Sequence, residues 1–132
     1  MWKPKPGTRR RKANVKRAVE AILPLDIDVK LKRRLLDACI WRRTELSGKH
    51  ALRYVSVAAR DLPPGCIHEH VFTRKRLIDD LMAGKPVGAV LKRAIACVVT
   101  GEEHTRLKDG NGWKRYREAG IKVYDRKTGK VR

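Results

Sequence analysis

The sequence predicts a small α+β protein that is mostly helical and carries a basic arm at its N-terminus. The chain has 132 residues, which is the usual size of a single domain. Apolar residues recur at helical spacing over much of the chain, and short apolar runs bounded by glycine or proline indicate strands. Lys and Arg number 33 against 14 Asp and Glu, so the formal net charge is +19.

This net charge is the feature of the composition that is most informative about function. Like charges repel one another in a compact chain, so an excess of this size is best explained by a polyanionic partner. Hydrophobic residues make up 42% of the chain, which is a normal globular share and argues against disorder over the whole length. The sequence therefore predicts a folded protein that binds nucleic acid, with DNA favoured over RNA.

We divide the chain into a flexible basic arm at 1–17, a helical segment at 18–50 and a core at 51–132. The arm contains eight basic residues and no acidic residue, and we expect it to be solvated and unpacked. Such an arm gains affinity for nucleic acid by releasing counterions from phosphates. The candidate contacts in the arm are Arg9, Arg10, Arg11 and Lys12.

Two helices are predicted in the first half of the chain. The first covers about 13–23 and ends at Pro24. The second covers about 28–46, with Asp26 or Asp28 as its N-cap. The segment 53–59 fits either a strand or a helix.

The second half is predicted to alternate between short strands and short helices. Thr73 is a suitable cap for a helix, and Pro86 suits the first turn of the next. Thr100 and Glu103 have the spacing of a capping box, which is the simplest role for Glu103. The predicted strands are 66–72, 97–99, 121–124 and 130–131, and the predicted helices are 73–83, 86–95, a helix from 100 and 113–119.

The chain is expected to be cytoplasmic, with no membrane partner. The longest uncharged run near its middle has eight residues, which is too short to cross a bilayer, and the N-terminus lacks the apolar stretch of a signal peptide. Three cysteines without a C-x-x-C pair do not form a disulfide framework, and reduced thiols fit this compartment. The oligomeric state is left open.

One constellation has the residue types for catalysis. His68 and His70 flank Glu69 on a predicted strand, and His104 follows a predicted helix cap 34 residues after His70. Imidazole and carboxylate groups bind divalent metal ions. In a basic protein they indicate phosphodiester hydrolysis, in which a neutral histidine takes a proton from water.

The segments His68–Val71 and Val98–Leu107 resemble the HNH-type, or ββα-metal, endonucleases over roughly residues 53–124. The resemblance implies a ββα-metal-like core and metal-dependent cleavage of nucleic acid. It implies that His70 is the general base and that Glu69 and His104 bind a divalent ion (Mg, Mn or Zn). His68, on the same strand, is a further candidate ligand for that ion. Near such a site, Arg74, Lys75 and Arg76 would hold the phosphate backbone.

Two alternatives remain open from the sequence. The family's central asparagine has no counterpart between His70 and His104, and this favours a nucleic-acid-binding protein without catalysis. A structural zinc site is the second alternative, and its ligands would be Cys66, His68, Cys97 and His104.

Overall fold

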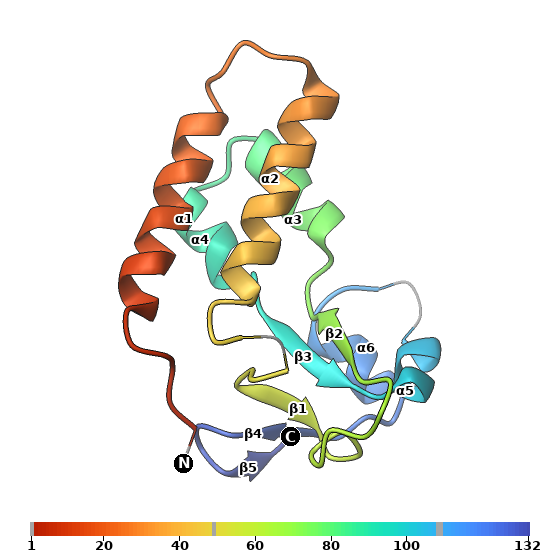
Figure 1. The fold of residues 1–132 in the computed structure, drawn as a ribbon. Coiled ribbons are helices and arrows are strands. Elements are labelled where there is room, and N and C mark those ends of the chain that lie inside the picture. Colours follow the sequence, from red (N-terminus) through yellow and green to blue (C-terminus); the bar gives the residue numbers. More distant parts are fainter. Residues whose placement is uncertain (1, 49, 108–109) are drawn as a thin grey trace.

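The computed structural model describes residues 2–48, 50–107 and 110–132, and it is an α+β fold. Four helices form a layer that stands beside one end of a small five-stranded sheet (Figure 1). The first two helices, α1 (Thr8–Ile22) and α2 (Val29–Thr44), form a hairpin. The α+β prediction is confirmed at this level.

The N-terminal helix begins earlier than the sequence indicated. We expected an unpacked arm over 1–17, and this is wrong for residues 8–17, which belong to α1. Thr8 is buried, its hydroxyl donates to the carbonyl of Lys5, and Val15 packs into the helical core. Ahead of the helix, Nε1 of Trp2 donates to the carbonyl of Ala51 at 2.9 Å, so the segment is tied to the region before the sheet.

The helical layer is completed by α3 (Arg74–Met82) and α4 (Val87–Lys92), which come from the second half of the chain. Asp28 caps α2 and Thr73 caps α3, as predicted. The core of this layer therefore crosses the boundary that we placed at residue 50. It consists of Val15, Val19, Leu36, Ile40, Leu77, Ile78, Leu81, Val90, Leu91 and Ala94.

The sheet has the strand order β2-β3-β1-β4-β5. Its strands are β1 (Tyr54–Ser56), β2 (Ile67–His70), β3 (Ala96–Val99), β4 (Val123–Asp125) and β5 (Lys130–Val131). Strands β1 and β3 are parallel, and every other neighbouring pair is antiparallel. The ambiguous segment 53–59 contains a strand over Tyr54–Ser56, which is followed by a turn. Strand β2 is left at an edge of the sheet.

Two short helices pack near the β2 edge, namely α5 (Gly101–Arg106), which directly follows β3, and α6 (Trp113–Glu118). Tyr116 of α6 is buried against Val71, Cys97 and Val99, which fixes α6 to the end of the sheet that carries β2 and β3. Within the described part of the chain, no helix combines the length and the apolar character needed to traverse a bilayer.

Candidate active site

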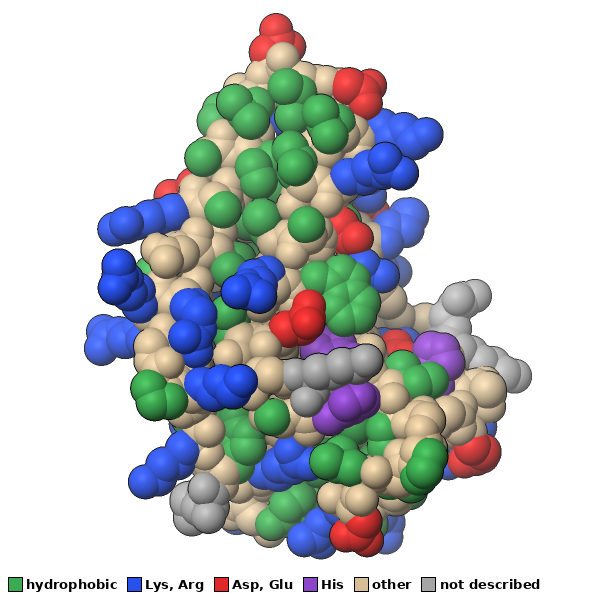
Figure 2. Space-filling model, viewed as in Figure 1, with side chains coloured by type: hydrophobic (Ala, Val, Ile, Leu, Met, Phe, Trp, Pro, Cys, Tyr) green, Lys and Arg blue, Asp and Glu red, His purple; other side chains and the backbone are tan. Residues whose placement is uncertain are grey.

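The edge strand β2 presents candidate residues on both of its faces. Side chains alternate along a strand, so His68 and His70 point to one face and Glu69 to the other. A groove of about 500 Å³ nevertheless collects side chains from both faces, because β2 has no neighbour on its outer side. Its lining residues include His68, Glu69, His70 and His104, together with Trp41, Arg74 and Lys75. Figure 2 shows histidine side chains on one face of the molecule, next to hydrophobic side chains.

Glu69 and His104 meet on one side of the strand. Nδ1 of His104 lies 2.5 Å from Oε2 of Glu69, although the residues are 35 positions apart. Helix α5 carries His104 to this place because the capping box of Thr100 and Glu103 starts the helix directly after β3. The predicted capping role of Glu103 is confirmed by this capping box. Glu103 also accepts a hydrogen bond from the buried hydroxyl of Ser56 at 2.5 Å.

Arg115 holds the same carboxylate from α6. Its side chain is buried, and Nη2 lies 3.2 Å from Oε1 of Glu69. The same nitrogen donates to the carbonyl oxygens of His70 and Val71. Arg115 thereby fixes both the Glu69 side chain and the backbone at the end of β2. The sequence analysis missed this residue, because a single Arg in a basic helix gives no signal of its own.

The two histidines of β2 converge on one hydroxyl group. Oγ1 of Thr44 lies 3.0 Å from Nε2 of His68 and 3.2 Å from Nε2 of His70. The hydroxyl donates its only proton to the carbonyl of Trp41 at 2.9 Å. A hydroxyl has one proton and two lone pairs, so Oγ1 accepts from both imidazoles. Both rings therefore carry a proton on Nε2, and in neutral His70 the unprotonated nitrogen is Nδ1.

The surroundings of His70 favour its neutral form. Burial is the main cause that lowers its pKa from 6.5 to about 3, and electrostatic interactions with His68, Arg74 and Arg115 act in the same direction. The ring of Trp41 covers His70 edge-on, with ring centroids 4.5 Å apart. His70 is thus neutral over the physiological pH range, with its one ring proton on Nε2.

The predicted phosphate-holding residues lie in different surroundings. Arg74 lines the groove, forms two hydrogen bonds of 2.8 and 2.9 Å to Asp37, and stacks over Trp41. Lys75 also lines the groove and pairs with Asp79, whereas Arg76 is exposed outside it. On α1, Arg9, Arg10 and Lys12 are exposed and Arg11 is partly covered.

The four predicted site residues form two pairs and not one cluster. Glu69 meets His104 on one face, and His68 meets His70 through Thr44 on the other. In the described residues there is no group of three or more His, Cys, Asp or Glu side chains placed to hold a metal. The same finding covers the alternative zinc set, in which Cys97 is fully buried in the core.

An asparagine contacts the segment that follows β2. Oδ1 of Asn111 accepts a hydrogen bond from the backbone amide of Thr73 at 2.8 Å, and the amide of Gly112 donates to the carbonyl of Val71. These contacts hold the chain just beyond His70.

Comparison of the whole chain with family models, with curated proteins and with solved structures finds no match in any of the three.

Proposed function

We propose that this protein is a metal-dependent endonuclease that hydrolyses phosphodiester bonds in nucleic acid. The observation that carries the proposal is the meeting of Glu69 with His104 across an antiparallel strand pair, β2 and β3, and the helix that follows it. This arrangement is what the resemblance to HNH-type endonucleases implies. The formal charge of +19 supports a polyanionic substrate.

The donor set fits one type of metal site better than another. Glu69 and His104 supply one carboxylate oxygen and one imidazole nitrogen. Mg²⁺ and Mn²⁺ sites commonly use few protein ligands and complete their coordination with water and substrate phosphates. A catalytic zinc site usually has three protein ligands, so two fit Mg²⁺ or Mn²⁺ better. When bound, such an ion stabilises negative charge on the phosphate oxygens.

The remaining roles fall to residues of the same groove. Neutral His70 offers Nδ1 as the proton acceptor for an attacking water molecule, since Thr44 occupies its Nε2–H. Arg115 keeps the Glu69 carboxylate in place. Arg74, positioned by Asp37 at the mouth of the groove, attracts the substrate backbone. Asn111 steadies the chain after His70, a task that the family gives to an asparagine at another position in the sequence.

A second candidate function has an observation of its own. The Glu69 carboxylate is paired with both His104 and Arg115. A carboxylate that is held by two protein partners suits a nucleic-acid-binding protein that retains the fold without catalysis.

A cleavage time course separates the two functions. Supercoiled DNA, single-stranded DNA and RNA are incubated with the protein in Mg²⁺ or Mn²⁺, with and without chelator. We expect cleavage that the chelator abolishes, and a loss of about 10²–10⁴-fold in rate in His70→Ala, which is the share of a positioned base. His50→Asn is the control, because His50 has a positive φ of 62° that Asn tolerates and lies outside the groove. Tight binding to all three substrates without cleavage would favour the second function.

A further inference from the structure

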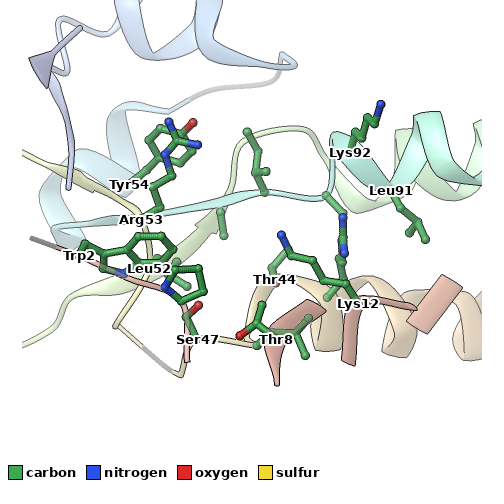
Figure 3. Close-up of a pocket in the computed structure, with 16 residues that line it drawn as sticks. Trp2, Thr8, Lys12, Thr44, Ser47, Leu52, Arg53, Tyr54, Leu91 and Lys92 are labelled. Carbon is green, nitrogen blue, oxygen red and sulfur yellow. The ribbon is translucent and has the colours of Figure 1, made fainter. Parts of the chain in front are cut away.

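A second cavity, separate from the groove, lies between α1, α2 and the start of β1 (Figure 3). Its volume is about 380 Å³, which is within the range of small-molecule sites. Four cationic residues contribute to its lining, namely Lys12, Arg43, Arg53 and Lys92. No acidic residue is present among the described residues that line it.

Most of these cations lack a carboxylate partner. Arg53 is bound to Asp125 through two hydrogen bonds of 2.9 and 2.7 Å. By contrast, none of the salt bridges formed within the described ranges involves Lys12, Arg43 or Lys92. Three uncompensated positive charges around one cavity repel each other, and a bound anion relieves that repulsion.

The titration of two of these residues agrees with such crowding. Partial burial lowers the pKa of Lys12, and the neighbouring charges of Arg43, Lys127 and Arg53 lower it further. Burial also lowers the pKa of Arg43. Figure 3 shows Lys12 reaching from α1 into the middle of the cavity.

The rest of the lining is suited to a flat ring and to polar atoms. The indole of Trp2 and the ring of Tyr54 contribute at the end where Arg53 lies, and the hydroxyl-bearing residues Thr8 and Ser47 contribute beside them. The Trp2 ring is fixed by its hydrogen bond to the Ala51 carbonyl. Aromatic side chains next to cations are the combination that binds a base and its phosphate.

Thr44 lies between this cavity and the groove. The residue lines the cavity, and its hydroxyl holds the imidazoles of His68 and His70, which line the groove. A nucleotide in the cavity would therefore be a close neighbour of a phosphodiester in the groove.

From this juxtaposition we infer that the cavity between α1, α2 and β1 binds one nucleotide of the nucleic-acid substrate, its phosphate at Lys12 and Arg43 and its base against Trp2. The assignment of the ligand to a nucleic-acid strand rests on the proposed function.

The test is a binding titration of the full chain in chelator, so that no cleavage occurs. The probes are thymidine 5′-monophosphate, thymidine and inorganic phosphate, and calorimetry measures the binding of each. We expect the monophosphate to bind at least tenfold more tightly than either of the other two. Lys12→Gln and Arg43→Gln should each weaken the binding of the monophosphate about tenfold. Trp2→Ala should weaken the binding of the monophosphate but not that of inorganic phosphate.

The matched controls are Lys30→Gln and Arg17→Gln, which remove one exposed cation each outside the cavity. They should change the affinity less than twofold, and melting curves check that every variant is folded. Equal losses in the cavity and control variants would overturn the inference, because the effect would then be one of net charge. Equal affinity for phosphate and monophosphate, with no effect of Trp2→Ala, would also overturn it, because it would indicate a simple anion site.

One further variant separates this inference from the proposed function. Glu69→Gln should abolish cleavage and leave monophosphate binding unchanged. If the parent cleaves nucleic acid but does not bind the monophosphate, only the cavity assignment fails. If it binds the monophosphate and never cleaves, only the enzymatic proposal fails.

Discussion

The Thr44 hydroxyl accepts a hydrogen bond from Nε2 of His70 at 3.2 Å, and this contact decides which nitrogen of the buried imidazole carries the proton. Thr44 is the last residue of α2, and His70 is the last residue of β2. The helical layer thus sets the protonation pattern of a residue on the edge strand. The role of Thr44 in the proposed chemistry is therefore one of positioning.

Thr44→Val tests this role. Valine keeps the shape of threonine but cannot accept the Nε2–H, so the imidazole loses the bond that selects its tautomer. We expect kcat to fall about tenfold, with KM nearly unchanged and melting temperature still well above the assay temperature. Thr44→Ser retains the hydroxyl and should recover most of the lost rate. Equal rates in the Val and Ser variants would show that the hydroxyl does not position His70.

The depressed pKa of His70 predicts a dependence of stability on pH. In the unfolded chain this histidine takes up a proton near pH 6.5, whereas in the folded chain it resists protonation down to about pH 3. Acid therefore favours the unfolded chain. Between pH 5.5 and 4.5, we expect the free energy of unfolding to fall by about 1.3 kcal/mol through this group.

Urea titrations of the parent and of His70→Gln at several pH values measure this slope. Glutamine keeps an N–H donor toward Thr44 but does not titrate, so the variant should lose most of the slope. His50→Asn serves as the control and should retain it. An unchanged slope in His70→Gln would mean that the pKa of His70 is not lowered in the folded protein.

Arg115 should matter for stability more than any neighbouring cation of α6. Arg115→Met leaves the Glu69 carboxylate and the carbonyl of Val71 without the donor that they share. Breaking a buried pair of this kind costs about 3 kcal/mol in the free energy of unfolding. Arg117→Met, on the exposed side of the same helix, should cost about 0.5 kcal/mol or less. Chemical denaturation compares the two variants, and equal small losses would show that Arg115 does not hold β2.

The basic start of α1 should contribute to the salt dependence of nucleic-acid binding. If about 6–10 phosphates are contacted, raising the salt from 50 to 200 mM weakens binding roughly 10³–10⁵-fold. Arg9→Gln combined with Arg10→Gln should lower the slope of log K against log salt by about 1–2. The pair Lys30→Gln and Arg34→Gln, at the other end of the hairpin, is the control. Identical slopes for both pairs would argue against a specific contact near Thr8. Deletion of residues 1–12 is a poorer test, because it removes the first turn of α1.

Local signals in the sequence foretold much of the fold. Capping patterns placed the starts of three helices, since an Asp or Thr side chain at the N-cap accepts a hydrogen bond from the amide three positions later. The proline and glycine breaks separated the short strands of the second half. The start of α1 was missed because arginines and lysines form helices well, and their charge was read as a sign of an unpacked arm.

The candidate site was predictable only in part. The resemblance implied that Glu69 and His104 act together, and the structure places them in contact. Trp41, Thr44 and Arg115 were not anticipated, because their roles depend on how α2 and α6 pack against β2. In the structure Glu69 contacts His104 and His70 contacts Thr44, because neighbouring side chains of β2 point to opposite faces.

The most direct test of the central claim is the dependence of the cleavage rate on Mn²⁺ concentration. If Glu69 and His104 hold the ion together, Glu69→Gln and His104→Gln should each raise the Mn²⁺ concentration for half-maximal rate by at least tenfold, and the double variant should be scarcely worse than either single one. Glu118→Gln, which neutralises an exposed carboxylate of α6, should leave that concentration unchanged. Half-maximal rates at the same Mn²⁺ concentration in the parent and in all these variants would contradict the account.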